Sequence, residues 1–179
     1  DERMNTSYEE ARAQFSLPRH EHFNFAVDVI DRWAEQTPDK LAMLWVNDEG
    51  VEQRLSFNDI SDRSKQAANF LQDAGVKRGD TVIVMLGRQQ AWWEIMTACL
   101  RMGAVVSPGT TQLSSNDIAY RVNATEASCI ITDVDNAPKL AGLKAQCSSL
   151  GQLVCVGGDF PACLNYDEQT EKANTHFAA

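Results

Sequence analysis

The stretch SPGTT at 107–111 combines residue types that can hold an anion. It follows the short apolar run AVV and precedes Ser114, which is suited to begin a helix. At the carboxyl end of a strand, backbone N–H groups, hydroxyls and the N-terminal end of the next helix can all face one anionic group. The alternative is a plain turn, in which Pro108 and Gly109 reverse the chain and Ser114 caps the helix. Spacing alone leaves both interpretations open.

Other residues that often do chemistry carry no recognisable motif. The sequence contains no GxxxxGK[ST], GxGxxG or GxSxG string, so two common nucleotide fingerprints and the hydrolase elbow are absent. Two further sets lie in polar surroundings, namely the histidines His20, His22 and His176 and the acid pairs Glu9–Glu10 and Asp133–Asp135. We interpret the histidines as solvated surface groups and the acid pairs as adjacent charges on loops or helix starts, and we predict neither a catalytic residue nor a metal site.

Five cysteines also argue against a metal or disulfide framework. They are Cys99, Cys129, Cys147, Cys155 and Cys163. Their number is odd, no CxxC pair occurs, and Cys99 and Cys129 fall within apolar patterns. Buried thiols in a reducing compartment are therefore expected.

Arg88 and the pair Trp92–Trp93 follow a strand-like apolar run, TVIVMLG. Sheets of α/β proteins place binding groups at the carboxyl ends of strands, although a lone arginine there is more often structural. Adjacent helical positions point about 100° apart, so both indoles cannot enter one core. We expect Trp92 to join the apolar stripe of its helix and Trp93 to cover a second surface, such as a neighbouring helix.

Composition limits the class of protein and its partners. The chain has 179 residues, 44% of them apolar, which is typical of a globular domain. Its 16 basic and 25 acidic residues give a net charge of −9, which disfavours nucleic acid and anionic lipid as partners. No apolar run reaches the length of about 18 residues that a membrane span needs. The polar, acidic start does not resemble a secretory signal, so we expect a cytoplasmic protein.

The first third of the chain predicts two helices around a hairpin. Apolar residues at helical spacing begin at Ala26 and stop before Pro38, and LAMLWV (41–46) and VEQRL (51–55) are typical of paired strands. Ser56, with Asp59 three residues later, predicts a capped helix that ends at Gly75.

The rest of the chain alternates strands with helices. The expected strands are TVIVMLG (81–87), AVVS (104–107), ASCIIT (127–132) and QLVCV (152–156). The helices between them are predicted from the stripe Trp92, Ile95, Met96, Cys99 and Leu100, from Ser114 as a cap through Tyr120, and over 137–145. This alternation predicts an α/β fold with a mostly parallel sheet and flanking helices. The continuous apolar run at 81–86 indicates a strand covered on both faces.

The pattern divides the chain into three parts. Residues 1–22 read as an N-terminal arm and residues 23–158 as the α/β subdomain. Beyond Gly158 the apolar pattern fades, with one acidic turn of helix near Asn165. We therefore expect residues 159–179 to be a linker toward a phosphate-loop segment that lies outside these residues.

Three long strings, in order, carry a family resemblance. They are FNFAVDVIDRWAEQTPDKLAMLW, LSFNDISDRSKQAANFLQDAGVKRGDTVIVML and RQQAWWEIMTACLRMGAVVSPGTTQLSSNDIAYRVNATEASCIITD, and they cover residues 23–133. Together they resemble the N-terminal part of AMP-forming acyl-CoA synthetases. Arg88, Trp92–Trp93 and PGTTQL are similar to the medium-chain branch. The resemblance implies the first subdomain of the large N-terminal domain of these enzymes.

The resemblance implies a two-step ligase. A carboxylate attacks the α-phosphate of ATP to give an acyl-adenylate and pyrophosphate, and the CoA thiolate then displaces AMP to form a thioester. Such chemistry uses ATP, CoA and Mg²⁺. In the family the phosphate loop and the catalytic lysine lie in other segments, and no TSGTTGxPK-like string occurs here. These 179 residues are therefore expected to be inactive alone, with no catalytic residue of their own.

The resemblance also implies one site and several open questions. Relatives that use CoA place the loop after the GAVV-like strand near the CoA tunnel, which here assigns Thr110, Thr111 and Gln112 to CoA binding. The implied partners are a carboxylic acid, ATP and CoA, with a homo-oligomer and a mitochondrial matrix location both open. Two alternatives remain: a free-standing, non-catalytic α/β binding or assembly module, and an aryl or fatty acyl-AMP ligase for a different acid.

Overall fold

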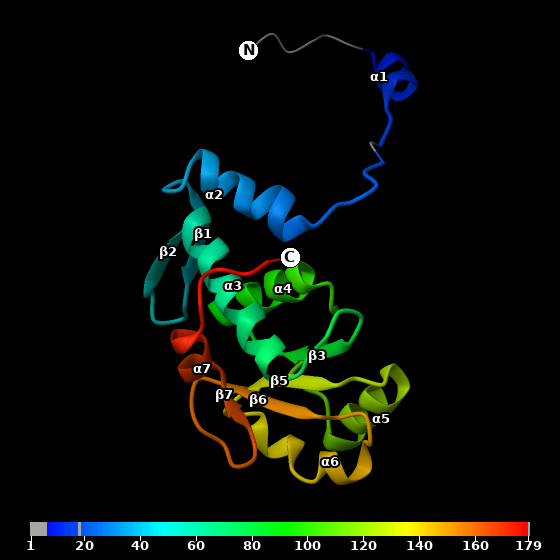
Figure 1. The fold of residues 1–179 in the computed structure, drawn as a ribbon, viewed down its shortest axis with the longest axis vertical. Coiled ribbons are helices and arrows are strands. Elements are labelled where there is room, and N and C mark those ends of the chain that lie inside the picture. The colour runs from blue at the N-terminus through cyan, green and yellow to red at the C-terminus, as the bar shows by residue number, and fades with distance from the viewer. Residues whose placement is uncertain (1–6, 18, 179) are drawn as a thin grey trace.

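A five-stranded parallel sheet forms the centre of the molecule (Figure 1). The computed structural model describes residues 7–17 and 19–178. The strands lie in the order β4-β3-β5-β6-β7. They are β3 (Thr81–Met85), β4 (Val105–Pro108), β5 (Cys129–Asp133), β6 (Gln152–Val156) and β7 (Leu164–Asn165). The predicted α/β fold with a parallel sheet and flanking helices is confirmed.

Helices cover both faces of this sheet (Figure 1). One face packs against α3 (Phe57–Asp73), α4 (Gln90–Met102) and α7 (Tyr166–Lys172), and the other against α5 (Ser115–Thr125), η2 (Ala137–Leu140) and α6 (Leu143–Gln146). In β3, Val82 and Val84 enter the first core, while Ile83 and Met85 enter the second. The strand is therefore covered on both faces, as its continuous apolar run predicted, because alternate side chains of a strand point to opposite faces.

Helix starts agree with the predicted caps. Ser56 with Asp59 begins α3, and Ser114 with Asp117 begins α5, each as a complete capping box. Helix α5 runs to Thr125, beyond the expected end at Tyr120. The helix expected over 137–145 is two short pieces, η2 and α6, since Gly142 at φ +77° interrupts it.

The hairpin and the helix before it are confirmed. β1 (Leu41–Val46) pairs antiparallel with β2 (Glu52–Ser56) as a two-stranded sheet of its own. The preceding helix begins as a π-helical segment, η1 (Ala26–Asp31), continues as α2 (Arg32–Gln36) and ends before Pro38. Lys40 lies 3.6 Å above the ring of Trp33, a cation–π contact that joins α2 to the start of β1.

The N-terminal arm lies away from the sheet (Figure 1). Of its predicted range, 1–22, residues 1–6 and 18 lie outside the described residues. Helix α1 (Tyr8–Gln14) buries no residue, and Tyr8, Phe15 and Leu17 are each at least 70% exposed.

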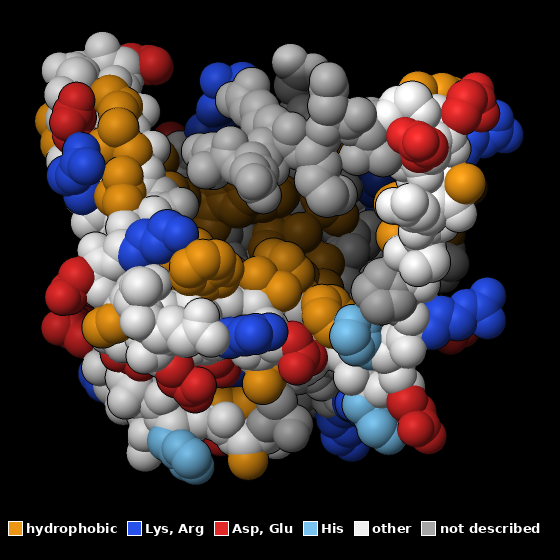
Figure 2. All heavy atoms as spheres, turned by 90° about the horizontal axis from the view of Figure 1, so that it is seen from above, with side chains coloured by type: hydrophobic (Ala, Val, Ile, Leu, Met, Phe, Trp, Pro, Cys, Tyr) orange, Lys and Arg blue, Asp and Glu red, His pale blue; other side chains and the backbone are white. Residues whose placement is uncertain are grey.

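Figure 2 shows hydrophobic side chains gathered in a hollow near the middle of the face seen from above.

The segment 159–179 was predicted as a linker, but within its described part, 159–178, a strand and a helix contribute to the sheet and the core. Strand β7 adds to the sheet beside β6, and Tyr166 is 2% exposed in the core under α3. Side chains of α3 hold the segment that follows, since Gln66 Nε2 donates to the Ala173 carbonyl and Asn69 Nδ2 to the Asn174 carbonyl. A single buried tyrosine within an acidic sequence leaves no apolar stripe, which is why the pattern seemed to fade.

Helix α4 differs from its predicted stripe. Leu100 is 42% exposed, while Glu94 and Arg101 are buried, at 6% and 2% exposed. The helix lies against the sheet on one side and against α3 and η1 on another, so it buries more than one stripe. Burial of charged groups is costly unless each has a partner.

Both buried charges have partners from other elements. The Arg101 guanidinium binds Asp31 through two hydrogen bonds, at 2.6 and 2.7 Å, and donates a third to Ser64 Oγ. Glu94 accepts from Arg63 at 2.9 Å and from the Tyr166 hydroxyl at 3.0 Å. These contacts join η1, α3 and α7 to α4.

No helix in residues 7–17 and 19–178 combines the length and the apolar character that crossing a bilayer requires.

Candidate functional site

The carboxyl edge of the parallel sheet is where ligands bind in α/β folds. The chain runs from β3 to β4 on one side and returns to β5 on the other, so the strand order switches between β3 and β5. Ligands of such sheets bind in the crevice outside the carboxyl ends of the strands at this switch point. The loops that follow β3, β4 and β5 at this edge are 86–89, 109–114 and 134–136.

The predicted loop lies at this edge. Gly109 N–H donates to the Val84 carbonyl at 2.9 Å, which ties the loop to the end of β3. A side chain at Gly109 would approach Leu113 Cδ1 to 3.2 Å and Met85 Cγ to 3.3 Å, so the close packing here favours glycine. Within the loop, Thr110 Oγ1 accepts from the Gln112 N–H at 3.2 Å. Thr110 and Gln112 are exposed and Thr111 is half-buried.

The start of α5 does not support the anion hypothesis. Asp117 Oδ2 accepts hydrogen bonds from both the Oγ and the N–H of Ser114, at 2.6 and 3.0 Å. These bonds lower the pKa of Asp117, so its carboxylate is ionised at neutral pH. The N-terminal end of α5 already interacts with this negative charge, so a second anion at the helix end itself would meet a like charge. The turn interpretation accounts for Ser114.

A cation that sequence reasoning missed lies against the predicted loop. Lys139, in η2, donates from Nζ to the Thr111 carbonyl at 2.5 Å and to Asn136 Oδ1 at 2.7 Å. Asn136 in turn donates to Asp133 Oδ1 from its backbone N–H and from Nδ2, at 2.9 and 2.8 Å. Asp133, interpreted from sequence as a charge on a loop or helix start, ends β5 and anchors this loop. Contact through a backbone carbonyl leaves no sequence motif, so no signal pointed to Lys139.

Arg88 and the two tryptophans lie around a groove near the same edge. The groove encloses about 510 Å³ between β1 and the start of α4. The Arg88 carbonyl accepts a hydrogen bond from Trp45 Nε1 at 2.7 Å, which links the hairpin to the loop after β3. The rings of Trp92 and Trp93 pack edge to face with their centroids 4.7 Å apart, and Trp93 is 51% exposed. The observed role of the Arg88 backbone is structural.

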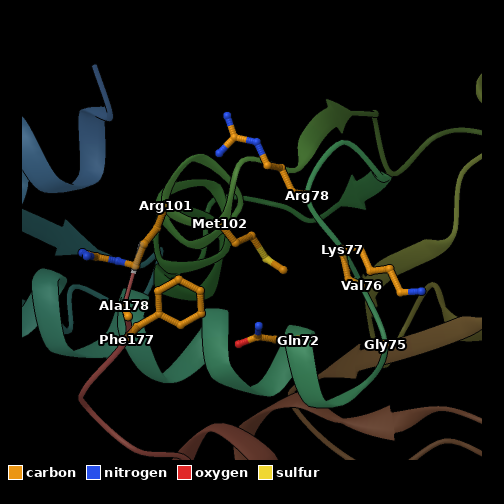
Figure 3. A pocket seen from close by; sticks show the side chains of 9 residues that line it. All are labelled: Gln72, Gly75, Val76, Lys77, Arg78, Arg101, Met102, Phe177 and Ala178. Atoms are coloured by element: carbon orange, nitrogen blue, oxygen red, sulfur yellow. The ribbon is translucent and has the colours of Figure 1, made fainter. Parts of the chain in front are cut away.

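A second hollow lies at the opposite, amino edge of the sheet. It encloses about 460 Å³ and includes Lys77, Arg78 and Arg101 in its lining. Figure 3 shows Phe177, Met102 and Gln72 directed toward its middle, whereas the side chains of Lys77 and Arg78 extend outward. The charge of Arg101 is already paired, since its guanidinium binds Asp31 and Ser64.

The predicted burial holds for four of the five thiols. Cys99, Cys129, Cys147 and Cys155 are buried, Cys163 is half-buried, and none of the five forms a disulfide. Burial raises the pKa of Cys99 to about 12 and that of Cys155 to about 11, so neither is a thiolate near neutral pH. Among the described residues, no three His, Cys, Asp or Glu side chains are grouped as a metal site would need.

Comparison with known proteins decides the family. The model of a family described as AMP-binding enzyme matches residues 30–178. The chain belongs to the AMP-binding enzyme family. This agrees with the resemblance to AMP-forming acyl-CoA synthetases that the sequence carries.

Curated relatives of this chain extend the agreement. Human acyl-coenzyme A synthetase ACSM3, mitochondrial, is 40% identical over 151 residues, which are 81% of this chain and 26% of that protein. Human acyl-coenzyme A synthetase ACSM5, mitochondrial, is 39% identical over 162 residues, 87% of this chain and 28% of that protein. The chain thus spans about a quarter of the length of these relatives.

Solved structures share the fold of this chain. A Brucella canis acyl-CoA synthetase superposes with a TM-score of 0.83 at 22% identity, over 95% of this chain and 33% of that one. The anthranilate CoA ligase AuaEII, solved with anthranoyl-AMP, superposes with a TM-score of 0.76 at 20% identity, over 91% of this chain and 30% of that one.

Proposed function

We propose that this chain is the leading α/β part of an AMP-forming acyl-CoA synthetase that activates a medium-chain carboxylic acid through an acyl-adenylate. The supporting observation is the 40% identity to human ACSM3 over 81% of this chain. The carboxylate oxygen would attack the α-phosphorus of ATP and release pyrophosphate, and the CoA sulfur would then attack the acyl carbon and release AMP.

The residues of this chain serve the second step. The described residues contain no group of ligands suited to Mg²⁺, and the sequence has no glycine-rich phosphate loop, so we assign ATP and Mg²⁺ to none of them. Thr110 and Gln112 are exposed polar side chains at the carboxyl edge, and Lys139 brings a positive charge beside them. Polar groups beside a cation suit a nucleotide-bearing thiol such as CoA.

Pyrophosphate release tests the proposed reaction. The product of the whole reading frame is incubated with ATP and with straight-chain acids of graded length and aromatic acids. We expect the highest rates with medium-chain acids, and the 179-residue chain alone is expected to release none. A preference for aromatic acids would indicate the aryl alternative. If none of the acids leads to pyrophosphate release, the result would indicate a non-catalytic module and contradict the proposal.

Substitution of Thr111 tests the proposed CoA loop. A Thr111→Arg side chain would crowd the loop, so we expect about a tenfold rise in KM for CoA, equivalent to about 1.4 kcal/mol. Adenylate formation, measured as pyrophosphate release without CoA, should stay nearly unchanged. Thr125→Arg, at the exposed C-terminal end of α5, is the matched control. An unchanged KM in Thr111→Arg would remove the assignment of this loop.

The location of the protein is a separate part of the proposal. The two human relatives carry "mitochondrial" in their names, which supports the mitochondrial matrix over the cytoplasm. Fractionation of cells that produce the natural protein distinguishes the two.

A further inference from the structure

One lysine, Lys139, bonds to a loop residue, Thr111, that lies 28 residues before it in the sequence. The ammonium of Lys139 donates both to the Thr111 carbonyl and to Asn136 Oδ1, and Asn136 is held in turn by Asp133 at the end of β5. We propose that Lys139 is a positioning residue that fixes the loop at 110–112 for the CoA-dependent step. This inference rests on the proposed function.

The connection crosses the switch point of the sheet. The loop at 110–112 follows β4, whereas Asp133 ends β5, and these two strands lie on opposite sides of β3. A continuous series of hydrogen bonds, from Asp133 through Asn136 and Lys139 to Thr111, therefore spans the carboxyl end of the strand between them. A loop tied at both sides of the crevice presents one geometry to a ligand, and positioning of this kind is what lowers the entropy cost of reaction.

The other hydrogen bonds described for this loop are short-range or lie at its start, and Leu113, just after it, packs against the core under α5. Thr110 Oγ1 and the Thr110 carbonyl accept from the Gln112 and Leu113 N–H groups, which closes a turn without fixing it in space. Gly109 N–H is bonded to β3 before the loop leaves the sheet. The ammonium is the contact that reaches Thr111 itself, and bonds from a charged donor are stronger than neutral ones.

The environment of Lys139 separates positioning from stability. The side chain is half-buried at the edge of the sheet, and its acceptors are loop groups. Loss of the ammonium is expected to release the loop while both cores stay packed. Loss of a residue that merely supported the fold would instead disturb the packing of the cores.

The test compares four forms of the product of the whole reading frame: wild type, Lys139→Met, Lys139→Arg and Lys172→Met. Methionine keeps the length of the side chain without its charge, arginine restores a cationic donor, and Lys172, paired with Glu168 on the exposed side of α7, is the matched control. Each form is assayed for KM for CoA, for pyrophosphate release without CoA, and for amide hydrogen exchange at Gln112 and Leu113. Asn136→Ala repeats the test if Lys139→Met fails to fold.

In Lys139→Met we expect KM for CoA to rise about tenfold and exchange at Gln112 and Leu113 to accelerate about tenfold, as loss of one charge-assisted bond predicts. Adenylate formation should stay within about twofold, Lys139→Arg should recover most of both effects, and Lys172→Met should show neither.

Two results would overturn the inference while leaving the proposed function intact. The first is an unchanged KM for CoA with normal adenylate formation, whether or not exchange accelerates. The second is an equal fall in both half-reactions, which would indicate general damage. If the wild type releases no pyrophosphate with any acid, the proposed function fails and the inference fails with it.

Discussion

The two faces of the sheet are held to their helices by different interactions. On the α3, α4 and α7 face, buried ions join the elements: Arg101 binds Asp31, and Glu94 binds Arg63 and Tyr166. On the α5, η2 and α6 face, the core is apolar and no described ion pair crosses it.

Two elements on the side of α3 and α4 combine little burial with polar contacts. Segment η1 and helix α7 have six and seven residues, and each buries one residue. One buried residue removes little apolar area from water. Length alone does not decide the matter, since η2 and α6 on the other face have four residues each and dock without a described ion pair. The bonds that Asp31 accepts from Arg101 and the bond that Tyr166 donates to Glu94 add to this burial. Helix α5, with Ile118 and Val122 fully buried, docks without such help.

Removal of Asp31 should have the largest effect. Asp31→Ala leaves the Arg101 guanidinium buried without its carboxylate, which costs about 4 kcal/mol of unfolding free energy by analogy with other broken buried pairs. Urea denaturation measures it. Lys172→Ala, which breaks an exposed pair, should cost less than about 0.5 kcal/mol.

A double substitution sharpens the same comparison. Asp31→Leu combined with Arg101→Met replaces the ion pair by apolar groups, and it should be less destabilised than Asp31→Ala. If Asp31→Ala lowered the free energy of unfolding no more than Lys172→Ala, the face covered by α3, α4 and α7 would not depend on its buried ions.

On the apolar face, Ile118→Ala should rank next. Ile118 is fully buried against the sheet, and an Ile→Ala change in a core costs about 3 kcal/mol through lost burial and the cavity left behind. Because no ion is involved, the loss measured by urea denaturation should be the same at pH 5 and pH 7. A loss that varied with pH would show that this face also relies on charge.

Tyr166→Phe should cost about 1.5 kcal/mol, because Glu94 loses one donor and keeps Arg63. Burial, and then the charge of Glu94, raise the pKa of Tyr166 well above its usual value. Stability from this tyrosine is therefore present below the unfolded pKa of about 10 and is lost as pH rises above it. Ultraviolet titration of phenolate should lose its latest transition in Tyr166→Phe, and an unchanged titration would contradict this.

The loss of stability at acid pH should change least on substitution of Asp31. Burial alone would raise the pKa of Asp31, but hydrogen bonds from Arg101 and Ser61 and the nearby positive charges outweigh it and leave the pKa lowered. Its stabilisation is present above the unfolded pKa of about 3.9 and is lost as pH falls through the lower folded value. Asp31→Asn should flatten the fall in stability between pH 4 and pH 2. An equal fall in wild type and variant would assign the acid sensitivity to other groups.

Sequence reasoning predicted the apolar face better than the ionic one. The caps at Ser56 and Ser114, the two-sided strand β3 and the order of strands and helices all follow from local rules that the structure obeys. Glu94 and Arg101 were missed because a helical stripe assigns charged residues to the solvent side. Their partners come from other segments, which a single helix cannot reveal.

The candidate site was predictable in part for the same reason. The place of the loop at 110–112, after β4 at the carboxyl edge, followed from the alternation of strands and helices. Its tie to Lys139 runs through the backbone carbonyl of Thr111, and the tie of Asn136 to Asp133 depends on a turn. Carbonyls are common to all residues, so such contacts appear only in three dimensions.

The cysteines give each face its own natural reporter. Cys99 is buried in the core under α3 and α4, and Cys147 in the core under α5 and α6. A reagent such as iodoacetamide can alkylate them only when the covering helices swing away from the sheet, so the labelling rate at each sulfur counts how often that side opens. Mass spectrometry of the two tagged peptides would time the opening of both sides in one sample, without any added probe.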